Sequence, residues 1–265
     1  MIKRCLSAIV LLLILIPVLI AGGKAFCLAV GIISILAFKE MLDLRTSHSK
    51  IPSGIALIAM LALLVLVFYE NNTSLLSLGI SHRVLAIVLL VFLMPTLFSY
   101  KNSQYSTHDA FYLIGVLVLL GTAFNSIIVL RNIDVNHLIY VFLVTVTTDT
   151  FAFLVGSMIG KHPLAPTISP KKTIEGGVGG LLMGTIIPAI FYYYFIGSEP
   201  VWFLLLMSFV LSFISELGDL LFSKIKREND IKDFSNLIPG HGGILDRFDS
   251  AICVVLAYIL FLQFI

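Results

Sequence analysis

Long apolar stretches alternate with short polar segments along almost the whole chain. A helix that crosses a membrane needs about 20 mostly apolar residues, because the hydrocarbon core is about 30 Å thick and a helix rises about 1.5 Å per residue. Nine stretches are candidates, although the third, fourth and ninth are short: residues 6–21, 25–42, 54–69, 84–98, 111–130, 138–159, 178–196, 201–222 and 251–265. The pattern predicts an all-α integral membrane protein, a polytopic bundle of about nine transmembrane helices.

The composition of the 265 residues points the same way. Hydrophobic residues make up 59% of the chain and charged residues only 12%, and the mean hydropathy is +1.06. Soluble domains carry roughly 25% charged residues, so an ordinary soluble enzyme is excluded. The chain has no run of like charge and no biased repeat, which excludes a disordered chain and leaves no basis for a nucleic-acid partner.

The basic residues define an orientation. If the N-terminus is cytoplasmic, only Lys24, Arg83 and Arg131 of the 17 Lys and Arg residues fall in segments on the outer side. Because Lys and Arg collect in cytoplasmic loops, this predicts a cytoplasmic N-terminus and a C-terminus outside. A signal peptide is the alternative for the first stretch, since Lys3 and Arg4 precede it, but the run is long for a signal sequence.

The polar residues that could take part in catalysis or binding gather in the second half of the chain. Two cytoplasmic loops, 160–177 and 223–250, hold most of them. We therefore expect residues 1–130 to form a lipid-facing scaffold of transmembrane helices. Residues 131–265 are expected to form the C-terminal helices, with the two loops building an active site that faces the cytoplasm.

The eighth stretch places two acids on one helical face. Ser212, Glu216, Asp219, Ser223 and Lys226 follow one another at steps of four, three, four and three residues. Ionisable side chains in a membrane helix are expensive and usually face the bundle interior or a wet cavity. The alternative is a helix end whose long charged side chains extend to the membrane surface. This would explain Lys226 but not Glu216 and Asp219, because acidic side chains are too short to reach that far.

The ninth stretch is too short to cross a membrane by itself. A helix over residues 251–265 would be about 22 Å long, so it must start earlier, near Leu245. This puts Asp246 and Asp249 one turn apart, level with Glu216 and Asp219. A capping role would explain one of these acids but not both. A cluster of carboxylates without His or Cys suits Mg²⁺, which commonly binds one or two carboxylates plus substrate phosphates.

The sixth stretch holds one further acid, Asp149. Small residues follow it at four-residue spacing, at Ala152, Gly156 and Gly160, and such spacing lets helices approach closely. We expect Asp149 to be buried against another helix. It would either line the site or hold it together by hydrogen bonds.

Both cytoplasmic loops contain groups that suit an anion. The first puts Lys171 and Lys172 beside glycines at the start of the seventh stretch, where backbone N–H groups favour phosphate. In the second, Gly242 and Gly243 allow the backbone to approach a ligand closely. His241 between the glycines of this loop is a candidate general base, phosphate donor or metal ligand.

A long motif runs through the second loop into the ninth helix. It reads Ser223-x-x-Lys226-Arg227-xxxx-Lys232-Asp233-xxxxx-Pro239-Gly240-His241-Gly242-Gly243-xx-Asp246-Arg247-x-Asp249. Its spacing resembles, throughout, the signature of the phosphatidate cytidylyltransferase (CDP-diacylglycerol synthase) family of membrane enzymes. Residues 169–176 are similar to that family's other loop, and Asp149 and Asp219 fall where the family carries acids. The resemblance covers about residues 147–250.

This resemblance implies transfer of CMP from CTP to phosphatidic acid, giving CDP-diacylglycerol and pyrophosphate for phospholipid synthesis in a bacterial plasma membrane. The implied catalytic residues are Asp219, Asp246, Asp249, Lys226 and Arg247, with the three acids as ligands of Mg²⁺ and of any second cation. The implied substrate-binding residues are Ser169, Lys171, Lys172, Thr173, Ser223, Arg227, Lys232, His241, Gly242 and Gly243. Asp149 and Glu216 are expected to line the site.

The resemblance also implies binding partners, and two alternative functions stay open. CTP, phosphatidic acid and membrane lipids are the expected partners, and the small-residue helix faces are compatible with a homodimer. One rival is a CTP-dependent lipid kinase that transfers the γ-phosphate. Another is a cation transporter that uses Asp149, Glu216 and Asp219 as an ion path, which leaves the long cytoplasmic motif unexplained.

Overall fold

The computed structural model describes residues 13, 16–46, 51–69, 82–98, 105–197, 199–238, 240 and 242–263. Within these residues the regular structure is helical apart from one short hairpin and an isolated bridge. Five helices are long and apolar enough to cross a membrane: α2 (Gly23–Thr46), α5 (Thr107–Ile133), α6 (Val135–Ile159), α7 (Ile174–Phe195) and α8 (Val201–Glu228). The chain is therefore an all-α integral membrane protein.

The remaining candidate spans are shorter or lie outside the described residues. Helices α3 (Ser53–Val67) and α4 (His82–Phe98) are apolar but have only 15 and 17 residues. The predicted stretch 6–21 falls mostly on residues that the structure does not describe. Five spans are thus supported by both length and composition.

The chain folds as two units. The first contains residues 1–129 and 234–245, and the second contains residues 130–233 and 246–265. The predicted second loop, residues 223–250, is therefore shared: its middle part belongs to the first unit, and its two ends belong to the second.

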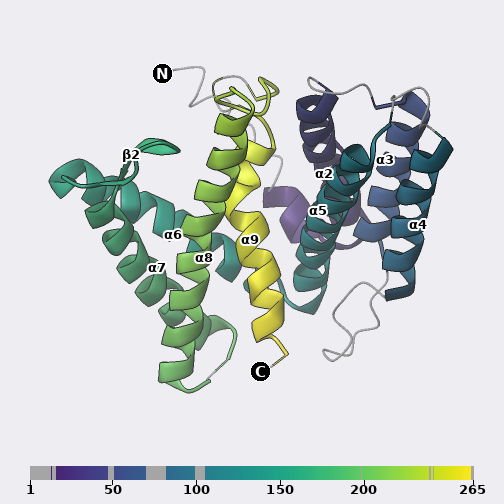
Figure 1. The fold of residues 1–265 in the computed structure, drawn as a ribbon. Helices are drawn as coiled ribbons and strands as arrows, with labels where there is room; N and C mark the ends of the chain where they lie inside the picture. The colour runs from purple at the N-terminus through teal and green to yellow at the C-terminus, as the bar shows by residue number, and fades with distance from the viewer. Residues whose placement is uncertain are drawn as a thin grey trace. The chain divides into compact units, whose positions relative to one another are not determined.

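The first unit holds α2, α3 and α4 and most of α5 (Figure 1). An ion pair between the Arg45 guanidinium and Asp109 Oδ1, at 2.7 Å, joins the end of α2 to the start of α5. The backbone N–H of Ser106 donates to the same carboxylate at 2.9 Å. Just before α5, the Tyr105 hydroxyl donates to the Phe92 carbonyl at 3.0 Å, and burial raises the pKa of Tyr105 to about 12. The phenol therefore stays a neutral donor at physiological pH.

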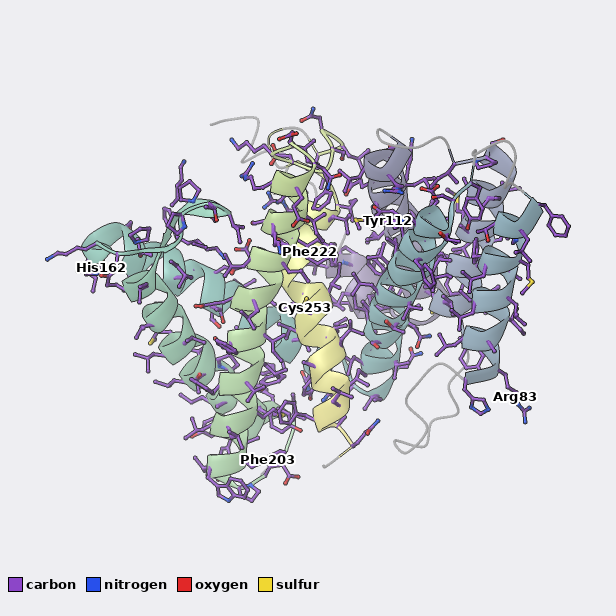
Figure 2. The ribbon with its side chains drawn as sticks, in the orientation of Figure 1. Arg83, Tyr112, His162, Phe203, Phe222 and Cys253 are labelled. Atoms are coloured by element: carbon purple, nitrogen blue, oxygen red, sulfur yellow. The ribbon has the colours of Figure 1, made fainter. Side chains whose placement is uncertain are left out.

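The second unit packs α6, α7 and α8 against one another (Figure 1). A two-stranded antiparallel hairpin, β1 (Pro163–Ala165) and β2 (Ser169–Thr173), connects α6 to α7. The last helix, α9 (Leu245–Phe261), lies beside α8. At their contact a Cβ on Gly218 would stand 3.0 Å from Cβ of Cys253, the residue labelled on α9 in Figure 2.

Small residues bring α6 and α7 into close contact. Gly176, Gly180 and Gly184 are buried along one stripe of α7. A Cβ at Gly180 would lie 2.8 Å from the Thr148 carbonyl oxygen, and one at Gly176 would lie 2.6 Å from that of Ala152. Side chains at these positions would push the helices apart, which explains why the stripe is made of glycine.

Three helix boundaries bear on the arrangement of the polar residues, and one of them lies where it was predicted. Helix α9 begins at Leu245, as the length argument required. Helix α7 begins four residues before residue 178, because the Thr173 hydroxyl caps it by accepting from the Gly176 N–H at 3.2 Å. Helix α8 continues past residue 222 to Glu228, so the second loop is shorter than expected.

Candidate active site

The second unit contains a cavity of about 450 Å³ between its helices and the hairpin. Its polar lining comes from α6, β2, α8 and α9: Asp149, Ser157, Lys171, Lys172, Thr173, Glu216, Asp219, Asp246 and Asp249. Ala152 and Phe153 of α6 and Leu164 of β1 add an apolar wall. The volume lies within the range of small-molecule sites. Acids that are 100 residues apart in sequence thus open onto one space.

Asp219 on α8 links the hairpin to the helix bundle. Its Oδ2 forms an ion pair with Lys172 Nζ, and both side chains are about one-quarter exposed. One turn later on α8, the Ser223 hydroxyl donates to Asp219 Oδ1 at 3.2 Å. The two oxygens of this carboxylate are therefore held by different elements, and Lys172 is directed into the cavity by the β2 strand.

Asp246 forms the more deeply buried ion pair of the site. Lys226 Nζ, in the last turns of α8, donates to Asp246 Oδ1 at 2.7 Å, and the two side chains are only 11% and 4% exposed. Opposite charges this far from water are held in place because breaking a buried ion pair is costly. The pair fixes the first turn of α9 against the end of α8.

Neither Glu216 nor Asp249 forms an ion pair like those of Asp219 and Asp246 among the described residues. Glu216 Oε1 is buried and has no hydrogen-bond partner among the described residues. The space it occupies exists because α7 has glycine there: Cβ atoms on Gly177 and Gly180 would lie 3.1 and 3.0 Å from Glu216 oxygens. Asp249 Oδ1 accepts from the backbone N–H of Ser250 at 2.8 Å. These carboxylates leave oxygen lone pairs available to a bound ligand.

Glu175 closes the base of the hairpin. Its Oε2 accepts from the backbone N–H groups of Lys161 and His162 at 3.0 and 3.2 Å. The His162 ring donates from Nδ1 to Oε1 at 2.6 Å, and this residue is labelled beside the hairpin in Figure 2. The start of the hairpin that carries Lys171 and Lys172 is thereby tied to the first turn of α7.

Some predicted residues lie outside the cavity lining. Ser169 pairs with Ala165 across the hairpin. Arg227 donates to the carbonyl oxygens of Ile168 and Ile231 at 3.2 and 3.0 Å. Lys232 is exposed after α8, and Arg247 is exposed on α9.

Gly242 and Gly243 of the predicted phosphate-binding loop are not part of the cavity lining. Gly242 and Gly243 belong to the first unit. The backbone of Gly242 has a φ of 78°, a conformation that favours glycine, and it forms a bridge with Ile238. His241 falls outside the described residues.

The lining has an excess of negative charge. Five carboxylates face two lysines in the cavity wall, a formal balance of −3, and the buried Lys226 brings it to −2. Among the described residues, no three Asp, Glu, His or Cys side chains stand close enough to hold a metal ion by themselves. Such a lining suits a cation that draws its other ligands from a substrate.

The chain is similar to known proteins over nearly its whole length. A model of the cytidylyltransferase family matches residues 2–265. The chain belongs to the cytidylyltransferase family. It is 34% identical over 252 residues to a phosphatidate cytidylyltransferase of Staphylococcus haemolyticus, and 35% identical over 255 residues to one of Staphylococcus aureus. Each alignment covers 95% of both chains, so the resemblance found in residues 147–250 extends over the first half as well.

Sequence reasoning missed two features of this candidate site. The apolar wall of Phe153 and Leu164 carries no sequence signal, because exposed apolar residues are expected everywhere in a membrane protein. The role of Glu175 in closing the hairpin was missed as well. The place of Glu175 in the first turn of α7 predicts only a favourable interaction with that helix's own N-terminus, not the hydrogen bonds from the N–H groups of Lys161 and His162.

Proposed function

We propose that this chain transfers CMP from CTP to phosphatidate, producing CDP-diacylglycerol and pyrophosphate. The observation that carries the proposal is the match of 95% of the chain, at about 35% identity, to proteins named for this activity. An oxygen of the phosphatidate phosphate attacks the α-phosphorus of CTP. The bond from that phosphorus to the β-bridging oxygen breaks, and pyrophosphate leaves. Because the nucleophile is already an anion, no strong general base is required.

We further propose that the cavity binds Mg²⁺ together with the nucleotide. Mg²⁺ commonly binds one or two carboxylates and takes its remaining ligands from phosphates and water. Asp219, Asp246 and Asp249 are the candidate ligands, and a second cation would use the same cluster. A bound cation offsets the charge of the triphosphate and of the five carboxylates. The negative excess of the lining supports this assignment.

The basic residues have complementary roles in this proposal. Lys172 and Lys226 currently neutralise Asp219 and Asp246, and in the complex their ammonium groups are positioned to share the phosphate charge. Lys171 lines the same cavity. Arg227 and Arg247, which lie outside the lining, are proposed to contact the nucleotide or the lipid headgroup, since guanidinium groups grip phosphate at two points.

The proposal includes a topology. Nine transmembrane helices with a cytoplasmic N-terminus would put the hairpin and the end of α8 on the cytoplasmic side, where CTP is found. The distribution of Lys and Arg supports this orientation. The small residues that suggested a homodimer pack α6 against α7 within the chain, so the proposal needs only one chain.

Transfer of label tests the proposal directly. The purified protein in detergent is incubated with phosphatidic acid, Mg²⁺ and CTP labelled at the α-phosphate. We expect the label to enter the lipid phase only when both phosphatidic acid and Mg²⁺ are present. Label transferred instead from γ-labelled CTP to a lipid alcohol would favour the lipid kinase, and cation flux in proteoliposomes without CTP would favour the transporter.

A further inference from the structure

A buried acid in the first unit organises the segment that precedes α9. Glu40 lies on α2 and is only 5% exposed. Its Oε1 accepts from the Ser235 hydroxyl at 2.7 Å and from the Ile244 N–H at 2.8 Å, and its Oε2 accepts from the Leu245 N–H at 2.8 Å. One carboxylate therefore holds both ends of residues 235–245, which we call the clamped segment.

The clamp depends on close approach of the backbone. A Cβ on Gly243 would collide with all three atoms of the Glu40 carboxyl group, so any other residue there would displace the carboxylate. The segment also turns back on itself, because the Ile238 N–H donates to the Gly242 carbonyl at 2.9 Å. Ser235, held by Glu40, accepts in turn from the Leu237 N–H at 3.2 Å. The fold of this segment is thus built around the acid.

The electrostatic setting explains why a charge is tolerated there. Within the part of the chain that the structure describes, no ion pair to Glu40 is found. Its charge is balanced by three donors, two of which are backbone N–H groups at the start of α9. Free N–H groups and the dipole at a helix N-terminus favour an anion. Glu40 therefore fills a place that a substrate phosphate could otherwise occupy.

We propose that Glu40 is a positioning residue for the nucleotidyl transfer. Leu245 is the first residue of α9 and is joined directly to Asp246, so the hydrogen bond from the Leu245 N–H to Glu40 sets where that helix begins. This role rests on the proposed function, in which Asp246 binds the cation. In this proposal the group that lies close to the Gly243 backbone is the Glu40 carboxylate and not a phosphate of CTP. The CTP phosphates therefore bind elsewhere, at the lysines of the cavity.

Three variants separate the parts of the clamp. Glu40→Gln keeps the shape but points an NH₂ group at one of its donors. Glu40→Ala removes every acceptor, and Ser235→Ala removes a single donor and leaves the acid in place. The matched control is Asp43→Asn, which removes the same charge from an exposed position on the same helix.

The measurements are hydrogen exchange at the amides of Ile244 and Leu245, the thermal midpoint, and kcat and KM for both substrates. We expect Glu40→Gln to speed exchange in the clamped segment and to lower kcat by at least about tenfold, because a displacement of about 1 Å can cost 100-fold in rate. KM for phosphatidate should stay within about twofold. Ser235→Ala should show a smaller change in the same direction, and Asp43→Asn none.

Two results would overturn the proposal. One is a Glu40→Gln protein with unchanged exchange at Ile244 and Leu245 and unchanged kcat. The other is faster exchange spread evenly over α2 to α5, with kcat falling only as the folded fraction falls. If the glutamate variants do not fold, Ser235→Ala decides by the same criteria. An inactive wild-type protein would instead refute the proposed function, and the exchange measurements would still test the clamp.

Discussion

Lys226 and Asp246 form an ion pair at 2.7 Å that joins the end of α8 to the first turn of α9. The two side chains stand on either side of the segment that connects α8 to α9, and both are nearly buried. A buried pair adds little stability compared with apolar residues of the same size, but breaking it is costly. The pair is thus better explained by the position it gives to Asp246 than by the stability it adds.

Replacing Asp246 with asparagine should separate activity from stability. We expect Asp246→Asn to reduce CMP transfer to background, since the proposed cation loses a carboxylate ligand. The free energy of unfolding should fall by about 3 kcal/mol, because the buried Lys226 charge loses its partner. Label transfer and denaturant unfolding in detergent measure the two effects.

A double variant provides the control for this prediction. Lys226→Met combined with Asp246→Leu removes both charges, so the stability should return close to that of the wild type while activity stays absent. Near-normal CMP transfer by Asp246→Asn would show that Asp246 is not a ligand of the cation. A double variant as unstable as the single one would show that the unpaired charge is not the cause.

Lys172 should act on the nucleotide rather than on the lipid. We expect Lys172→Ala to raise the KM for CTP by about tenfold, because a hydrogen bond to a charged group contributes about 1.5 kcal/mol. The KM for phosphatidate should change less. Lys161→Ala is the matched control, since Lys161 is an exposed lysine of the same loop outside the cavity lining. An unchanged CTP dependence would leave Lys172 with only its pairing to Asp219.

The acids could be predicted from the sequence because their positions follow from helix geometry. Spacing alone put Glu216 and Asp219 on one face of α8, and helix length alone required α9 to begin near Leu245. The structure has both features and opens all of these acids onto one cavity. These arguments need only the 3.6-residue repeat of a helix, which is a local property of the chain, and the thickness of a bilayer, which is the same for every membrane protein.

Long-range contacts could not be predicted in this way. Glu40 stands near the end of an apolar stretch, where an acid at the membrane surface would look the same in sequence. Its partners lie about 200 residues further along the chain, and no periodicity connects them. The hairpin was missed for a related reason. Residues 163–173 are too short and too rich in proline to show a strand pattern, and Glu175, which holds the base of their hairpin, lies outside that range.

Removal of divalent cations should abolish the reaction. We expect no transfer in EDTA and full recovery with excess Mg²⁺, while Ca²⁺ should restore little, because it prefers more ligands at longer distances. Asp249→Asn should raise the Mg²⁺ concentration for half-maximal activity by more than the roughly tenfold that loss of a group supporting a ligand costs, because Asp249 is proposed as a ligand itself. Asp43→Asn is again the control for loss of one negative charge. Full activity in EDTA would argue against a cation-dependent mechanism.

The glycine stripe of α7 should be intolerant of even one methyl group where it meets α6 and α8. At Gly184 a Cβ would collide with the Thr148 and Ser212 hydroxyl oxygens, which are 2.8 Å apart and hydrogen-bonded to each other. Gly184→Ala must shift both helices or break that bond. We expect a loss of about 2 kcal/mol in the free energy of unfolding, the middle of the range for overpacking.

A second glycine supplies the comparison for this change. Gly115 of α5 has nothing within 4 Å of where its Cβ would stand, so Gly115→Ala should be neutral or slightly stabilising, as expected for alanine in a helix. Unfolding of both variants in the same detergent measures the difference. Because Asp149 follows Thr148 directly, Gly184→Ala should also lower kcat in the fraction that remains folded. Equal stability of the two alanine variants would show that α7 can move away from its neighbours at little cost.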